Sequence, residues 1–101
     1  MKAALRFAKR AQGDWKRIGE VDRGRISGSL EGLRADPKTA SLDTEPLEGA
    51  APWQRLRVGG HRVIFRAFSA DERRAYGVER GYVVDRVIDR RDLDRVVRTL
   101  R

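Results

Sequence analysis

The residues best suited to chemistry are arginines in the segment 53–68, which reads WQRLRVGGHRVIFRAF. Side chains alternate between the two faces of a strand, so Arg55 and Arg57 share one face of the first half, and Arg62 and Arg66 share one face of the second half. When the apolar residues of the two halves pair, these four arginines come together on the opposite face. Guanidinium groups stay charged and bind phosphate through two parallel hydrogen bonds. We therefore predict a cationic surface that suits RNA, with an ordinary solvated hairpin face as the alternative.

Further side chains near this surface are of types that bind RNA. Arg86, or Arg90 after the next predicted strand, would add positive charge from a neighbouring strand. Trp53, His61 and Tyr82 provide rings on which an unpaired base can stack. The residues that we expect to bind RNA are Trp53, Arg66 and Arg86.

The whole chain is basic, with 23 Lys and Arg against 15 Asp and Glu and a formal net charge of +8. Only Lys2, Lys9, Lys16 and Lys38 are lysines, which leaves 19 arginines. This excess favours association with nucleic acid or with an acidic protein. The alternative for any single arginine is that a GC-rich genome favours its codons and that the side chain is merely solvated.

Composition also excludes several kinds of chemistry. The chain has no Cys and one His, so a disulfide framework, a thiol nucleophile and the usual zinc sites are excluded, and we expect no metal and no cofactor. No apolar run is long enough for a membrane span or a secretory signal. We expect a cytoplasmic protein that does not act on membranes.

The arginines need a scaffold, and local patterns predict its elements. Gly59-Gly60 is a dipeptide typical of a tight hairpin turn, so the segment 53–68 is predicted as two antiparallel strands. Strand patterns also cover residues 3–8 and 82–88. Apolar residues spaced by three and four predict helices over 8–18, 21–35 and 91–100. Asp36-Pro37 is expected to end the second helix.

Two segments show no periodic pattern. Residues 37–52 carry all three prolines and small polar residues, and we expect a connecting loop. Residues 69–81 are polar and rich in turn formers. The elements therefore follow the order β-α-α-β-β-β-α in a single α+β domain over residues 1–101. We expect a small antiparallel sheet packed against an N-terminal helical hairpin, with a C-terminal helix and with the helices on one side of the sheet.

Three segments carry a resemblance to a known family. The first is Leu47-Glu48-Gly49, which matches an L-x-G element. The second is the hairpin from Trp53 to Phe65, which has basic residues on its first strand and an Arg early in its second strand. The third is Val87-Ile88-Asp89-Arg90-Arg91, at the end of the last strand. In these segments the chain resembles the RelE/ParE superfamily of toxins from bacterial type II toxin–antitoxin modules. The order of elements agrees along nearly the whole chain, and the RelE-like branch is favoured.

This resemblance implies a function. RelE-like members are endoribonucleases that cut mRNA in the ribosomal A site, whereas ParE-like members act on DNA gyrase and lack the nuclease residues. The corresponding catalytic positions are Arg55, Arg57, Arg62 and Arg90. A ribose 2′-hydroxyl would attack the adjacent phosphate, with Arg62 stabilising the charge on that phosphate, Arg55 and Arg57 positioning the RNA, and Arg90 nearest the leaving group.

The chain departs from the family pattern where protons must be transferred. Many RelE-like toxins carry a Tyr near the C-terminus and others use a Glu and a His, but the tail RRDLDRVVRTLR has neither Tyr nor His. Glu45 is the candidate base. His61 has a suitable ordinary pKa, but strand alternation places it on the face opposite Arg62. Tyr82 is a further candidate for a proton-transfer or stacking role, with burial as its alternative.

The resemblance also implies partners. They are a cognate antitoxin protein, mRNA in the ribosomal A site, and operator DNA only through the antitoxin complex. Two alternatives stay open: a ParE-like inhibitor of gyrase without catalysis, and an inactive member that serves as a corepressor with its antitoxin.

Overall fold

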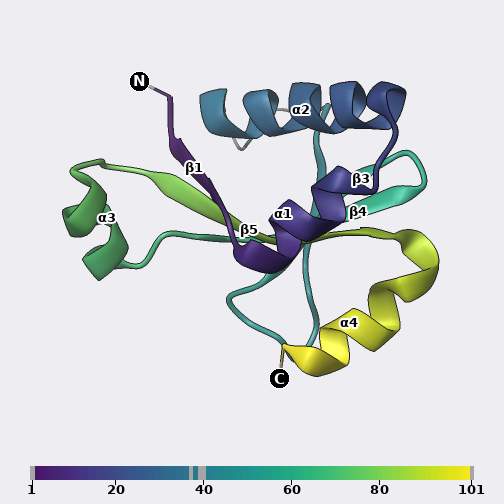
Figure 1. Ribbon diagram of the computed structural model, residues 1–101. Coiled ribbons are helices and arrows are strands. Elements are labelled where there is room, and N and C mark those ends of the chain that lie inside the picture. Colours follow the sequence, from purple (N-terminus) through teal and green to yellow (C-terminus); the bar gives the residue numbers. More distant parts are fainter. Residues whose placement is uncertain (1, 37, 39–40, 101) are drawn as a thin grey trace.

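The computed structural model describes residues 2–36, 38 and 41–100. Their elements in chain order are β1 (Ala4–Phe7), α1 (Lys9–Lys16), α2 (Glu20–Ala35), β2 (Asp43–Pro46), β3 (Gln54–Val58), β4 (His61–Ala67), α3 (Ala70–Tyr76), β5 (Gly81–Asp89), the 3-10 turn η1 (Arg90–Asp92) and α4 (Leu93–Thr99). Figure 1 shows them around one sheet. The predicted α+β class is confirmed. Pro37, the expected helix stop, lies outside the described residues, and α2 ends at Ala35.

The strands form one five-stranded sheet in the order β1-β5-β4-β3-β2. The pairs β2/β3, β3/β4 and β4/β5 are antiparallel, as expected, but β1 pairs with β5 in parallel. β1 and β5 are far apart in the sequence and are not joined by a hairpin. Their pairing therefore does not have to be antiparallel.

The β3–β4 hairpin has the predicted register. Leu56 pairs with Val63, and Arg57 pairs with Arg62. Gly59 adopts a φ of 58°, which a residue with a side chain rarely adopts, and so makes the tight turn possible. The apolar partners then lie on one face and the arginines on the other.

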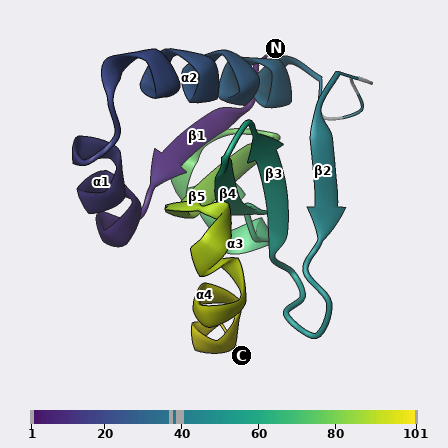
Figure 2. The same cartoon turned by 90° about the vertical axis from the view of Figure 1, so that its right-hand side faces the viewer.

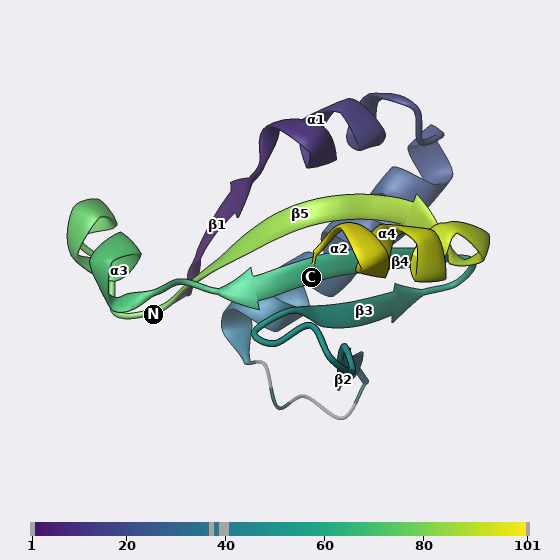
Figure 3. The same ribbon diagram turned by 90° about the horizontal axis from the view of Figure 1, so that it is seen from below.

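Apolar side chains cover both faces of the sheet, so the expectation of helices on one side was wrong. On one face α2 packs its buried residues Ile26, Leu30 and Leu33 against the sheet. On the other face α4 packs Val96 against Ile64 and Ile88. Figure 2 shows α2 and α4 on opposite sides of the strands, and Figure 3 shows α4 lying across β4 and β5. The chain reaches the second face because η1 turns it under the end of β5.

The predicted loop over 37–52 was wrong in part, because β2 lies within it. Asp43, Thr44, Glu45 and Pro46 pair with β3 at the edge of the sheet. Acidic residues and Pro are poor strand formers, which hides this strand in the sequence. At an edge, however, a Pro does not interrupt a second ladder.

A helix also occupies part of the polar segment 69–81, where none was predicted. The side chain of Ser69 accepts from the N–H of Glu72, and Glu72 accepts from the N–H of Ser69, which forms a capping box at the start of α3. Gly77 ends the helix in the left-handed conformation. The S-x-x-E pattern and this Gly are signals that a sequence analysis can detect.

No helix in the described part of the chain is long and apolar enough to cross a membrane.

Candidate functional site

Four arginines gather where the β3–β4 turn meets the end of β5. Arg57 and Arg62 are direct partners across the hairpin, and Arg55 lies two residues before Arg57 on the same face. Arg90 follows β5, and its N–H donates to the carbonyl of Gly60 at 3.0 Å. We call Arg55, Arg57, Arg62 and Arg90 the arginine cluster. The structure therefore brings together the four positions that the resemblance assigned to catalysis.

Arg62 lies at the centre of the arginine cluster. Burial first, and then the positive charges of Arg57, Arg55 and Arg90, lower the pKa of Arg62 from its ordinary value. Its Nη1 donates to the carbonyls of Gly59 at 3.1 Å and His61 at 3.0 Å. No ion pair of Arg62 forms within the part of the chain that the structure describes. The backbone thus orients a guanidinium whose surroundings favour an added anion.

Two carboxylates of β2 face the other side of this cluster. Arg55 Nη2 lies 2.8 Å from Glu45 Oε2, and Arg55 Nη1 lies 3.0 Å from Asp43 Oδ1. Asp43 also lies 3.9 Å from Arg57 Nη1. The sequence analysis found Glu45 but missed Asp43, although the two acids alternate with Thr44 as strand neighbours do. The side chain of Arg55 is 16% exposed and that of Arg57 is 57% exposed, so Arg57 is the more accessible cation.

Of the three candidates for proton transfer or stacking, only Glu45 lies on the face of the arginine cluster. His61 pairs with Val58, which packs in the α2-side core, so the imidazole lies on that opposite side, as alternation predicts. Tyr82 is 8% exposed and packs edge to face on Phe65, with ring centroids 5.9 Å apart. Tyr82 is therefore a core residue.

Trp53 and Arg66 lie at the other end of the same face. The Arg66 guanidinium stands over the Trp53 ring, with Cζ 5.5 Å from the centroid. Arg66 Nη1 lies 2.6 Å from Glu72 Oε1, and Arg6 Nη2 lies 3.2 Å from Glu72 Oε2. The hydrogen bond from Arg66 and then that from the Ser69 backbone lower the pKa of Glu72 to about 2, and the bond to Glu72 raises the pKa of Arg66. Arg66 is thus held by α3.

Arg86, which with Arg90 was one of two residues expected to add charge to the predicted cationic surface, forms an ion pair with α1. Its Nε lies 2.8 Å from Asp14 Oδ2, and the same oxygen accepts from the N–H of Val87 at 2.9 Å. This ion pair raises the pKa of Arg86. Asp14 therefore fixes α1 to β5 beyond the point where β1 ends.

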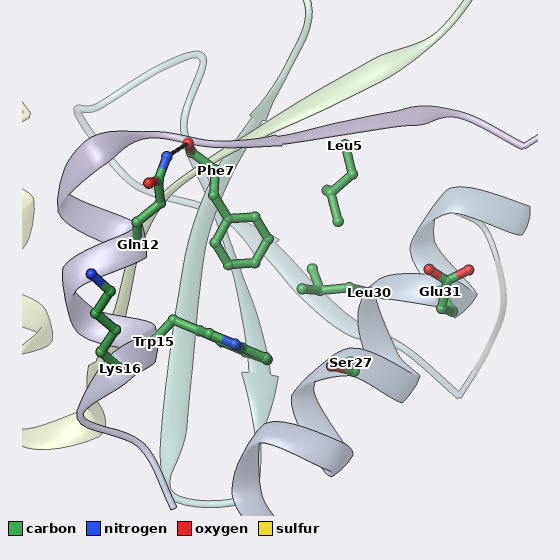
Figure 4. Close-up of a pocket in the computed structure, with 8 residues that line it drawn as sticks. All are labelled: Leu5, Phe7, Gln12, Trp15, Lys16, Ser27, Leu30 and Glu31. Atoms are coloured by element: carbon green, nitrogen blue, oxygen red, sulfur yellow. Dashed lines mark hydrogen bonds between the residues drawn. The ribbon is translucent and has the colours of Figure 1, made fainter. Parts of the chain in front are cut away.

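A separate apolar groove of about 460 Å³ lies between β1, α1 and α2 (Figure 4). Gln12 bridges its upper edge by donating to the carbonyl of Phe7 at 3.0 Å. None of the predicted site residues lines it. Its walls are formed by Leu5, Phe7, Trp15 and Leu30, with Gln12, Lys16, Ser27 and Glu31 around them.

No group of three His, Asp or Glu side chains among the described residues is arranged to hold a metal ion.

The fold of this chain is that of RelE toxins. The chain matches a chain of the RelB–RelE antitoxin–toxin complex from Methanococcus jannaschii with a TM-score of 0.67 and 22% identity, over 90% of this chain and 96% of that chain. It matches the RelBE2 toxin–antitoxin complex from Mycobacterium tuberculosis with a TM-score of 0.66 and 18% identity, over 89% and 100%. A mutant of the E. coli toxin RelE in the free state matches with a TM-score of 0.67 and 19% identity, over 99% and 94%.

No protein-family profile and no curated protein sequence matches the chain. The resemblance to RelE toxins that the sequence analysis stated is confirmed at the level of the fold.

Proposed function

We propose that this chain is the toxin of a type II toxin–antitoxin system and that it cleaves mRNA in the ribosomal A site. The observation that carries the proposal is the state of Arg62, which is partly buried among three other arginines and is oriented by backbone carbonyls. Asp43 and Glu45 pair with Arg55, and Asp43 also lies near Arg57, but among the described residues Arg62 forms no ion pair and so has the most to gain from an added anion. An RNA phosphate is such an anion, and solved structures of the same fold are RelE toxins.

The reaction that suits this cluster is transfer within the RNA strand. The 2′-oxygen bonds to the adjacent phosphorus, the bond from phosphorus to the 5′-oxygen breaks, and a 2′,3′-cyclic phosphate and a 5′-hydroxyl result. Arg62 stabilises the negative charge that builds on the phosphate oxygens. Arg55 and Arg57 position the strand, and Arg90 is the arginine that would act nearest the leaving 5′-oxygen.

The 2′-hydroxyl must lose a proton and the 5′-oxygen must gain one, which water supplies in this proposal. Arginine is a poor proton acceptor because its ordinary pKa is above about 12. Glu45 is the carboxylate that we propose as the base, since it lies beside Arg55 on the exposed edge strand. Its bond to Arg55 directs the carboxylate toward the arginine cluster.

An antitoxin is the partner that this proposal requires, and several solved structures of this fold are complexes with RelB. An acidic antitoxin would cover the arginine cluster and neutralise it. Operator DNA would be bound only through that complex, and the toxin would act in the cytoplasm.

Primer extension on a reporter mRNA tests the proposal. The wild-type chain and Arg62→Ala are induced separately, at matched protein levels and without antitoxin. We expect cleavage in phase with codons from the wild type and none from Arg62→Ala. The matched control is Arg66→Ala, which removes an arginine from the same strand and face but outside the cluster.

Other outcomes would identify the alternatives. Growth arrest with intact mRNA would contradict the nuclease and make DNA gyrase the target to test. The absence of any growth inhibition would favour a corepressor that works only with its antitoxin.

A further inference from the structure

A groove of about 500 Å³ lies beside Arg57 at the β3–β4 turn, on the side away from β5. Its walls come from α2, from the β3–β4 turn and from the segment that leads into β2. Arg57 belongs both to this groove and to the arginine cluster. The groove therefore continues the proposed active site around the end of the hairpin. The lining residues that matter here are Arg25, Gly28, Ser29, Arg57 and Gly59.

Arg25 brings a second positive charge to the groove. It is exposed, and both of its terminal nitrogens lie 3.2 Å from the point where a Cβ on Gly59 would stand. Its guanidinium thus lies against the bare backbone of the turn. In the described part of the chain Arg25 forms no ion pair or hydrogen bond through its side chain. A guanidinium without a counter-charge is available to an anion.

Gly28 leaves the helix side of the groove open. A Cβ at this position would meet no atom within 4 Å. A glycine within a helix lowers helix stability without improving packing here. The neighbouring hydroxyl of Ser29 adds a hydrogen-bonding group to the same wall. The groove thus combines two guanidinium groups, a hydroxyl group and the open position at Gly28.

We propose that this groove binds the sugar–phosphate backbone of the RNA strand next to the nucleotide that is cut. The inference rests on the proposed function, since it extends the same strand beyond the arginine cluster. Arg57 would contact the strand where it leaves the cluster, and its Nη1 lies 3.9 Å from Asp43 Oδ2. Arg25 would bind the next phosphate, and Gly28 would let the backbone approach the helix. An RNA strand fits better than an acidic protein because the groove is continuous with the surface that takes the scissile phosphate.

Binding of a fluorescent 2′-O-methyl RNA oligonucleotide tests the groove apart from catalysis, because the blocked 2′-oxygen prevents cleavage. The dissociation constant is measured by anisotropy at several salt concentrations. We expect Arg25→Ala to weaken binding about five- to tenfold and to reduce the salt slope by about 0.7, the value for one phosphate contact on a single strand. Gly28→Glu should weaken binding at least as much, because it places a negative charge at this open position.

A matched substitution separates the groove from overall charge. Gly13→Glu in α1 makes the same change at another helical glycine whose Cβ would meet no atom within 4 Å, and Gly13 does not line the groove. We expect it to weaken binding less than about twofold. Thermal melts should show that all three variants are folded, with the two Gly→Glu variants melting at or above the wild type because a helical glycine is replaced. In the ribosomal cleavage assay, Arg25→Ala should raise KM and leave kcat unchanged.

The outcomes distinguish the two proposals. Equal weakening by Gly13→Glu and Gly28→Glu, or an unchanged salt slope in Arg25→Ala, would overturn the groove even if the wild type cleaves mRNA. If the groove variants bind RNA normally but no longer bind an acidic antitoxin, the groove is a protein interface and the inference is wrong. If the wild type does not cleave mRNA but the groove variants bind RNA more weakly than the wild type, the groove is an RNA-binding site and the proposed nuclease activity is wrong.

Discussion

Arg62 and Arg66 lie on the same face of β4, four residues and about 13 Å apart, yet their surroundings are opposite. Arg62 stands among Arg55, Arg57 and Arg90, and burial together with these charges lowers its pKa. Arg66 is bound by Glu72, and this bond raises its pKa. The surroundings differ because α3 lies at one end of the sheet and the β3–β4 turn at the other (Figure 1).

This difference separates arginines that hold the fold from those that are free for a ligand. Arg66 fixes α3 to the sheet, and Arg86 fixes α1 to it through Asp14 in the same way. Arg62 fixes no other element and is oriented by its own turn. An arginine whose neighbours repel it has more to gain from an incoming phosphate than one that already has a carboxylate.

The largest expected effect is on catalysis by Arg62. Arg62→Ala should lower the rate of mRNA cleavage about 10²- to 10³-fold, the usual cost of removing one group that stabilises transition-state charge. Its melting temperature should stay unchanged or rise, because a repelled charge is removed. Arg66→Ala should do the reverse, lowering the melting temperature while cleavage continues. Cleavage rates in a purified translation system and thermal melts measure both; a destabilised Arg62→Ala with normal cleavage would remove the distinction.

Glu45→Gln tests whether Glu45 is the base beside the arginine cluster. If Glu45 takes the proton of the 2′-hydroxyl, the substitution should lower the cleavage rate about 10²-fold. Asp43→Asn, which removes the neighbouring carboxylate on the same strand, should lower the rate far less. Single-turnover cleavage rates measure both variants, and equal losses would show that the two acids only position Arg55.

Asp14→Asn tests the paired arginines. The side chains of Arg86 and Asp14 are 19% and 10% exposed, so loss of the carboxylate charge leaves a largely buried guanidinium unpaired. The free energy of unfolding should fall by about 2 kcal/mol. Urea denaturation measures it. The exposed pair of Lys2 and Glu31 provides the control, because Glu31→Gln should change stability by less than about 0.5 kcal/mol.

The pH dependence of stability tests the ion pair of Glu72 with Arg66. Its pKa is about 2 in the folded chain, below its ordinary 4.5, so the charged form is stabilised by folding. This contribution is complete above about pH 4.5 and is lost as the pH falls toward 2. The melting temperature should therefore decline over that range, and Glu72→Gln should make the decline shallower. Equal slopes in melts of the two proteins would mean that the pair with Arg66 adds no stability.

Much of the candidate site was predictable from the sequence, because it depends on strand alternation. Gly59-Gly60 sets the turn, and alternation then places Arg55, Arg57 and Arg62 on one face and His61 on the other. The strand β2 was not predictable in the same way. Its residues have low strand propensity, and it forms because β3 offers an open edge and because its acids face Arg55 and Arg57.

Which arginines share a face can be predicted from the sequence alone, because side chains along a strand have a two-residue period. Which of these arginines lack an ion pair depends on the folded chain. Glu72 comes from a helix that was not predicted, and Asp14 lies 72 residues before Arg86. Ion pairing depends on contacts between distant elements, and local patterns do not encode those contacts. The same holds for Arg25, which reaches the groove only because α2 packs across the hairpin turn.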